Sequence, residues 1–179
     1  EHFFDAYKAN TEYALKTIKA AEDSGAKLVC LCDTNGGTIT SEVTTIVKVV
    51  KQLLKGPVGF HGHNDAGMAI ANSIAAVEAG CVQVQGTING YGERCGNADL
   101  IPIIAVLKLK LHKDCISEAR LRELTEVSRF ISEISNMKQA DNQPFVGKSA
   151  FAHKAGVHIN AILKTPLSYE HIDPSLVGN

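Results

Sequence analysis

The stretch SGAKLVCLCDTNGG, residues 24–37, joins a short apolar run to a polar, glycine-rich end. The run KLVCLCD (27–33) is rich in Val, Leu and Cys, which is typical of a strand that is followed by a loop. Two later stretches have the same composition, GPVGFHGH (56–63) and CVQVQGTIN (81–89). The sequence therefore predicts three short strands, each of which leads into polar residues.

Helical patterns separate these strands. TEYALKTIKAAEDSG has a predicted cap at Thr11 and ends at Gly25, SEVTTIVKVVKQLLKG covers residues 41–56, and GMAIANSIAAVEAG ends at Gly80. A weak internal repeat, at an offset of 55 residues, matches Gly25 with Gly80. Strand and helix in alternation predict a parallel sheet that is covered by helices.

A repeated βα unit with polar residues after each strand fits a (β/α)8 TIM barrel, whose chemistry lies at the carboxyl ends of the strands. A doubly wound sheet follows the same rule, so the pattern leaves that fold open. Counting EHFFD as the first strand gives about four βα units. Since the chain starts at Glu1 without Met, we expect an α/β piece of a longer protein, and if the fold is a TIM barrel, half of the barrel lies outside these 179 residues.

The pattern changes after the helix predicted in NADLIPIIAVLKLKLH. From Ser117 the apolar residues recur at helical spacing, which predicts one long amphipathic helix. Its apolar stripe consists of Leu121, Leu124, Val127, Phe130, Ile131 and Ile134. FAHKAGVHINAILK is predicted to be a further helix. We therefore divide the chain into a half-barrel catalytic region, 1–112, and a helical lid or linker subdomain, 113–179.

Composition excludes several classes of function. The 179 residues are 45% hydrophobic and 21% charged, and the formal net charge is -1. A net charge so close to zero gives no sign of electrostatic attraction to nucleic acid or to an anionic membrane. No apolar run reaches the ~20 residues that span a bilayer, and no signal peptide is recognised. The five cysteines lack metal-type spacing, and Cys30 and Cys32 in an apolar run indicate buried thiols in a reducing compartment, so we expect a cytoplasmic protein.

The pair His61 and His63 is the first candidate for chemistry. Residues two apart in a strand point the same way, so both imidazoles lie on one face at the strand's end, where they could bind one divalent ion. Asp65 lies on the same face and could be a further ligand or could orient an imidazole. Hydrogen-bonded or exposed histidines without a metal are the alternative.

Two other strand ends carry polar residues. TINGYGERCGNADL offers Glu93, Arg94 and Asn97 among glycines, but its spacing is not that of a phosphate-binding loop, and Glu93 with Arg94 could be a solvated ion pair. CDTNGG offers Asp33 and Thr34, either as a substrate contact or as the turn before a helix.

Taken together, these stretches resemble a known family. HGHNDAGMAIANSIAAVEAG, QGTINGYGERCGNADL, LCDTNGG and GKSAFAHKAGVHINAI are similar to the second half of the metal-dependent acyltransferase barrels that condense acetyl-CoA with a 2-oxo acid. These are the 2-isopropylmalate, homocitrate and citramalate synthases. The resemblance covers nearly the whole chain, and FVGKSAFAHK looks most like the citramalate synthase branch.

The resemblance implies a role for particular residues. His61, His63 and Asn97 match metal ligands, whereas the family's Asp ligand and catalytic Arg belong to a first strand outside these 179 residues. Thr34 matches the residue that hydrogen-bonds the 2-oxo acid. Three positions match catalytic residues: Glu1, His158 and Tyr169.

The implied reaction is the condensation of acetyl-CoA with pyruvate to (R)-citramalate, in branched-chain amino-acid biosynthesis, by an enzyme with Mg, Mn, Co or Zn and with two identical subunits. The alternative products are 2-isopropylmalate and homocitrate. A metal-dependent hydrolase is a different class with an HxH pair, but it needs ligands that the next strand does not offer. We expect the isolated half-barrel to be inactive, with sheet edges that need the other half.

Overall fold

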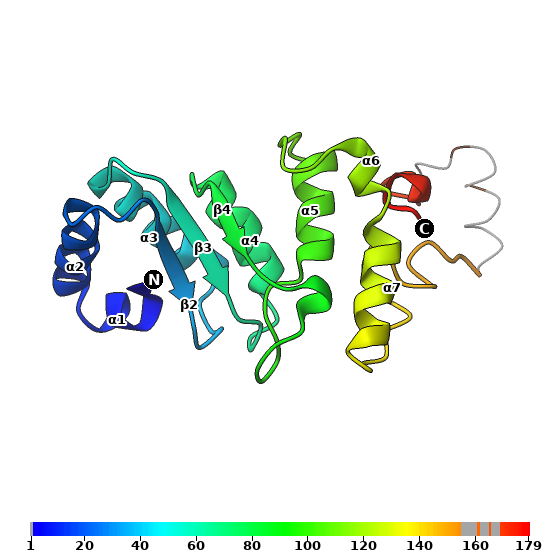
Figure 1. The fold of residues 1–179 in the computed structure, drawn as a ribbon, viewed down its shortest axis with the longest axis horizontal. Helices are drawn as coiled ribbons and strands as arrows, with labels where there is room; N and C mark the ends of the chain where they lie inside the picture. Colours follow the sequence, from blue (N-terminus) through cyan, green and yellow to red (C-terminus); the bar gives the residue numbers. More distant parts are fainter. Residues whose placement is uncertain (1, 155–160, 162–164, 166–168) are drawn as a thin grey trace. The chain divides into compact units, whose positions relative to one another are not determined.

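The computed structural model of the protein describes residues 2–154, 161, 165 and 169–179 (Figure 1). Its chain forms two compact units, Glu1–Leu100 and Ile101–Asn179. The functional boundary predicted at 112/113 stays a prediction, because the compact units describe packing alone.

The first unit is a parallel sheet with helices. Its four strands lie in the order β1-β2-β3-β4, and each pairs in parallel with the next. The strands are β1 (His2–Phe3), β2 (Val29–Asp33), β3 (Val58–Gly62) and β4 (Gln83–Gln85). The helices are α1 (Phe4–Ala9), α2 (Thr11–Asp23), α3 (Thr40–Leu53) and α4 (Ala69–Glu78), with a 3-10 turn η1 (Ile88–Gly90). The predicted parallel α/β arrangement is confirmed.

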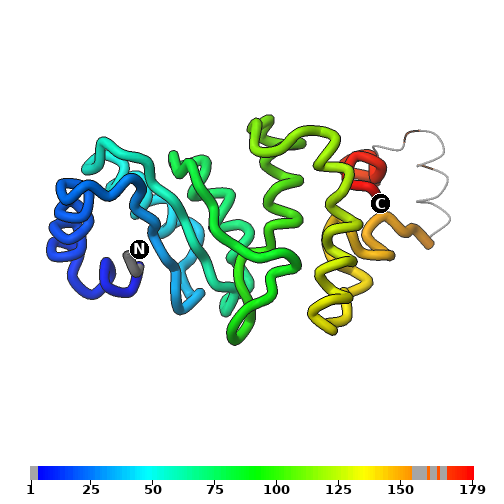
Figure 2. The backbone as a smooth tube through the Cα atoms, viewed as in Figure 1, coloured from blue at the N-terminus to red at the C-terminus, as the bar shows by residue number. Residues whose placement is uncertain are grey.

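Strand register separates an apolar face of the sheet from a functional one. Leu31 of β2 is level with Phe60 of β3, and both belong to the core with Val47 of α3. Cys32 is level with His61, so these two side chains share the opposite face. Helices α3 and α4 pack together and against β3, as the tube in Figure 2 shows. The apolar contacts of one face thus fix the strands that carry His61.

The ends of α2 and α4 follow the predicted glycines, whereas α3 ends at Leu53, before the predicted Gly56. Gly25 and Gly80 have φ values of +96° and +114°, which glycine adopts without steric cost. At the other end of α2, however, the prediction of Thr11 as the cap is wrong. Asn10 is the N-cap and accepts a hydrogen bond from the Tyr13 amide, whereas the Thr11 hydroxyl donates to the Tyr7 carbonyl.

Helical segments make up much of the described part of the second unit, and the first of them begins at the unit boundary. They are α5 (Leu100–Leu109), α6 (Glu118–Leu121), α7 (Leu124–Ile134) and the 3-10 turn η3 (Pro174–Val177). The predicted continuous helix from Ser117 is therefore wrong: it is interrupted between α6 and α7. The C-terminal turn approaches this break so closely that a Cβ on Gly178 would lie 2.1 Å from the Arg122 carbonyl oxygen.

The apolar stripe predicted for this region is also wrong in part. Phe130 and Ile134 are 57% and 63% exposed, whereas Thr125 and Ser128 are buried. Hydroxyl hydrogen bonds explain the difference: Thr125 Oγ1 donates to the Val177 carbonyl over 2.7 Å, and Ser128 Oγ accepts from the Gln139 side chain over 2.6 Å. Bonded hydroxyls can be buried with little penalty. Across the described ranges, no helix is both long enough and apolar enough to cross a membrane.

Burial predicts which cysteines react. Cys30, Cys32 and Cys81 are buried, and burial raises the pKa of the Cys81 thiol to about 12, whereas Cys95 and Cys115 are exposed. Because the thiolate is the nucleophile, we expect iodoacetamide at pH ~8 to label only the two exposed cysteines of the native protein. Peptide mass spectrometry measures this, with the denatured protein as the control that labels all five. Fast native labelling of Cys81 would contradict the packing.

Candidate active site

His61 and His63 lie together at the carboxyl end of β3. His61 is in the strand, His63 follows it directly, and both rings are half-buried. Their ring centroids are 5.1 Å apart, and the ring planes are nearly perpendicular at 85°. The predicted arrangement of two imidazoles on one face is therefore present.

A short antiparallel bridge brings Asn97 beside His63. The Asn64 amide donates to the Gly96 carbonyl over 3.0 Å, and the Ala98 amide donates to the Gly62 carbonyl over 2.9 Å. These bonds join the loop after β4 to the end of β3. Asn97, which is 34 positions after His63 in the sequence, thus reaches the histidine pair.

The Asn97 side chain is oriented by its own hydrogen bond. Its Nδ2 donates to the Tyr91 carbonyl over 3.1 Å, and its Oδ1 is buried without a hydrogen-bond donor among the described residues. A Cβ on Gly92 would lie 2.1 Å from that Nδ2, so the approach requires glycine. Buried polar atoms without partners are rare in folded proteins. An amide oxygen in this condition is suited to a cation.

His63 also has a buried polar atom without a hydrogen-bond partner among the described residues. Its Nδ1 atom is buried and has no hydrogen-bond partner in the part of the chain that the structure describes. Two imidazoles and an amide oxygen form a donor set that fits a divalent ion of intermediate hardness. No group of three His, Cys, Asp or Glu side chains gathers around a possible ion within the described ranges, and the amide of Asn97 is the oxygen donor that lies beside His63.

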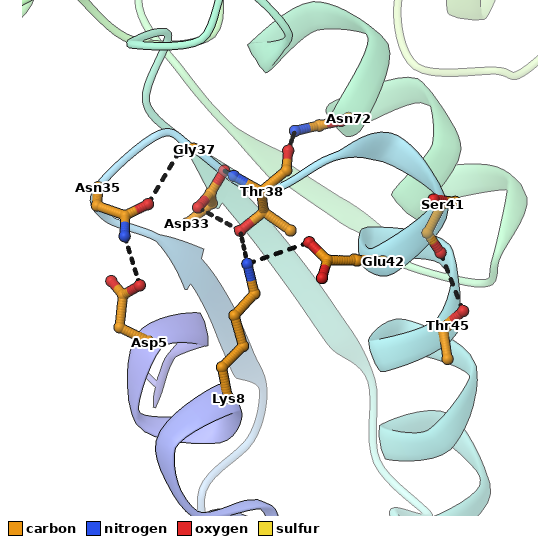
Figure 3. A network of polar contacts seen from close by, with 10 residues as sticks. All are labelled: Asp5, Lys8, Asp33, Asn35, Gly37, Thr38, Ser41, Glu42, Thr45 and Asn72. Atoms are coloured by element: carbon orange, nitrogen blue, oxygen red, sulfur yellow. Dashed lines mark hydrogen bonds and ion pairs between the residues drawn. The ribbon is translucent and has the colours of Figure 1, made fainter.

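The loop after β2 is held by a buried carboxylate (Figure 3). Asp33 has no exposed surface, and the Thr38 hydroxyl donates to its Oδ1 over 2.7 Å while the Thr38 amide donates to its Oδ2 over 3.2 Å. The same hydroxyl accepts a bond from Lys8 Nζ over 3.1 Å. Asn72 of α4 donates to the Thr38 carbonyl over 2.7 Å. Residues 33–38 therefore form a closed, internally bonded turn.

The Asp33 backbone connects this turn to the histidines. Its carbonyl accepts hydrogen bonds from the His63 amide over 3.1 Å and from the Gly36 amide over 3.2 Å. Thr34, the predicted substrate contact, follows Asp33 directly and is half-buried. One residue thus fixes both the backbone of His63 and the start of the Thr34 loop.

Arg94 binds the loops after β2 and β3 at once. Its Nε and Nη2 donate to the two carboxylate oxygens of Asp65 over 2.8 and 3.0 Å, and Nη2 also donates to the Thr34 carbonyl over 2.6 Å. The Arg94 hydrogen bond holds the pKa of the Asp65 carboxyl below its usual value of 3.8. The predicted solvated pair of Glu93 and Arg94 is also present: Arg94 Nη1 lies 3.9 Å from Oε2 of the exposed Glu93, while Nε and Nη2 bind Asp65 and Thr34.

The Asp65 carboxylate is paired with Arg94 and not with an imidazole. It forms a bidentate pair with the guanidinium, so the predicted orientation of an imidazole is wrong, whereas a role as a further ligand stays a prediction. The reason is geometric: Asp65 lies in a turn after the strand, and the alternation that puts side chains on one face ends there. Its neighbour is Gly36, where a Cβ would lie 2.4 Å from Asp65 Oδ2.

The three residues predicted to be catalytic are not among the described residues of the first unit. Glu1 and His158 lie outside the described residues. Tyr169 lies in the second unit, is 45% exposed, and its ring centroid is 6.2 Å from that of His153. Catalytic roles for all three stay predictions.

The geometry defines a class: a parallel βα protein with a candidate cation site at the carboxyl ends of its strands. A family model described as HMGL-like matches residues 2–131, and one described as homocitrate synthase post-HMGL domain-like matches residues 145–179. The chain belongs to the HMGL-like family. Members of this family are generally dependent on divalent metals.

Curated relatives extend the comparison over the whole chain. It is 55% identical to (R)-citramalate synthase of Geobacter sulfurreducens and 56% identical to that of Aquifex aeolicus, with all of this chain and 34% of each relative covered. Identity to 2-isopropylmalate synthase of Methanocaldococcus jannaschii is 39%, over 97% of this chain and 33% of that protein. The chain thus spans about a third of the length of these relatives.

Solved structures support the fold. HMG-CoA lyase of Bacillus subtilis superposes with a TM-score of 0.61 at 22% identity, over 70% of this chain and 44% of the lyase. The carboxyl transferase domain of Rhizobium etli pyruvate carboxylase gives 0.61 at 21%, over 70% of this chain and 21% of that one. These neighbours contain TIM barrels of HMGL-like type, which confirms the predicted fold class for this parallel-sheet piece.

The contribution of the Thr38 hydroxyl to the Asp33 turn can be measured as a change in protein stability. Thr38→Val keeps the shape of the side chain but removes the hydroxyl that donates to the buried carboxylate, so we expect unfolding free energy to fall by ~1–3 kcal/mol. Thr45→Val is the matched control, because the exposed Thr45 hydroxyl bonds only to the helix carbonyl of Ser41 among the contacts drawn in Figure 3. Urea unfolding followed by circular dichroism measures both, and equal losses would contradict a special role for Thr38.

Proposed function

We propose that the chain is part of a metal-dependent acyltransferase that condenses acetyl-CoA with a 2-oxo acid, pyruvate in the first place, to give (R)-citramalate. The observation that supports this most is the meeting of His61, His63 and Asn97 beside the Thr34 loop, in a chain whose relatives at 50–56% identity include five (R)-citramalate synthases.

His61, His63 and Asn97 would hold the ion, and Mg, Mn, Co or Zn are the candidates. The orientation of Asn97 by Tyr91 and the buried Nδ1 of His63 favour this assignment. When bound, a divalent ion supplies Lewis-acid polarisation of the keto group of the 2-oxo acid.

The reaction needs other groups from the protein. The methyl carbon of acetyl-CoA loses a proton and forms a bond to the keto carbon, the keto oxygen gains a proton, and water then breaks the thioester and releases the CoA thiol. Thr34 can hydrogen-bond the 2-oxo acid through its hydroxyl. Removal of the methyl proton, or activation of the water, suits a histidine with a pKa near neutrality, and we assign this role to His158 on its sequence motif.

Further parts of the proposal rest on sequence similarity. Glu1 and Tyr169 are assigned as catalytic residues that complete the site. In the family that the sequence resembles, the helical subdomain reaches over the active site of the neighbouring subunit, which supports a homodimer. The buried thiols of the first unit favour a cytoplasmic location.

Two alternatives are less supported. Two 2-isopropylmalate synthases share 39–40% identity with the chain, as against 50–56% for five of the (R)-citramalate synthases and 38% for that of Methanocaldococcus jannaschii. No comparison named above favours a metal-dependent hydrolase, and the strand after His63 offers no His or Asp in QVQ.

Substrate choice is decided by one assay. A full-length protein that carries this chain is supplied with acetyl-CoA and pyruvate, 2-oxoisovalerate or 2-oxoglutarate in turn, and thiol release is measured. We expect kcat/KM for pyruvate to exceed that for the other two by at least ~100-fold, since a site fitted to a methyl group excludes larger chains. Equal rates with all three acids, or a preference for 2-oxoisovalerate, would refute the citramalate assignment.

Metal binding is tested without turnover. In the same full-length protein, His61→Ala and His63→Ala should each weaken Mn²⁺ binding by at least ~100-fold, because loss even of outer-shell groups costs 10–100-fold. His112→Ala is the control, since His112 is an exposed histidine of the second unit. Isothermal titration with Mn²⁺ gives the affinities, and wild-type binding by both His61→Ala and His63→Ala would rule out the two histidine ligands.

A further inference from the structure

The Arg94 guanidinium is the structural link between three loops of the first unit. Arg94 itself follows β4, its two acceptors on Asp65 follow β3, and the Thr34 carbonyl follows β2. Exposed ion pairs usually contribute little, but a bidentate fork with a third, backbone acceptor fixes geometry as well as charge.

The local backbone agrees with a positioning role. Arg94 has a φ of +54°, a conformation that non-glycine residues rarely adopt and that here points its fork at the Thr34 loop. Gly36 has a φ of +66°, and its carbonyl accepts from the Ala66 amide over 3.0 Å. The loops after β2 and β3 are thus in direct contact where Arg94 binds both.

We propose that Arg94 is a positioning residue that sets the place of Thr34 relative to the histidine pair and so determines the affinity for the 2-oxo acid. This inference rests on the proposed function for the role of Thr34. The turn from Asp33 to Thr38 holds Thr34 on one side, and the Arg94 bond to its carbonyl holds it on the other. Without the fork, that carbonyl and the Asp65 carboxylate lose their common donor.

Lysine cannot replace this arrangement. Its single ammonium keeps the positive charge but lacks the planar fork that reaches both carboxylate oxygens and the Thr34 carbonyl at once. Arg94→Lys therefore separates geometry from charge. Arg120→Lys is the matched control, since Arg120 forms a two-oxygen pair with Glu123 in the second unit and both side chains are exposed.

The first measurement is kinetic and uses the full-length protein. Arg94→Lys should raise KM for the 2-oxo acid about tenfold or more, with kcat and KM for acetyl-CoA changed less than about twofold, because the loss concerns binding of one substrate. Arg120→Lys should change none of these constants. In a Thr34→Ala background, Arg94→Lys should add less than about twofold, because the two residues act as one unit. The proposal would be overturned if the effects of Arg94→Lys and Thr34→Ala on KM were fully additive, or if Arg94→Lys left KM for the 2-oxo acid unchanged.

The second measurement needs no turnover. Amide hydrogen exchange of residues 34–37 should accelerate in Arg94→Lys and not in Arg120→Lys, while Mn²⁺ affinity stays within a few-fold of wild type. If the wild type used no 2-oxo acid, the proposed function would fail, yet exchange would still decide whether Arg94 holds the loop. Asp65→Asn gives a second variant with the same expected direction. Unchanged exchange in both variants, or a matching loss of Mn²⁺ affinity, would refute positioning.

Discussion

The arrangement of the candidate site depends on the buried carboxylate of Asp33. A charge without exposed surface is costly unless hydrogen bonds compensate it, and the Thr38 hydroxyl and amide provide two. The chain must therefore turn back on itself between residues 33 and 38. The Asp33 carbonyl is then fixed as well, and it accepts the His63 amide. One electrostatic requirement consequently stabilises the turn and sets the position of a candidate ligand.

Close packing between loops also orients the polar groups of the candidate site. Gly36 lies against Asp65, and Gly92 lies against Asn97, at distances where a Cβ would overlap the neighbouring atoms. Glycine at these positions lets two loops come together and lets the Asn97 amide turn its nitrogen to Tyr91. The polar groups of the site are thereby oriented by backbone packing, before any ligand contributes.

The fold could be predicted from the sequence wherever one physical signal decides the structure. Apolar runs such as residues 27–33 gave the strands, and glycines such as Gly25 gave the helix ends. Periodicity failed in α7, where it counts Phe130 as buried and Ser128 as exposed, because a pattern of apolar residues does not register a hydroxyl with a partner in another segment. The cap at Asn10 was missed because two adjacent residues could both have capped α2.

The site was predictable only in the part that lies on a strand. His61 and His63 follow from alternation along β3, whereas the role of Asn97 came from resemblance. The Arg94 and Asp65 pair joins positions 29 residues apart, and no spacing rule covers such a distance. A parallel sheet brings the carboxyl ends of successive strands to one edge, so residues from separate loops meet there. Sequence can show that each loop is polar, but the choice of partners is made by loop backbones that fold against one another.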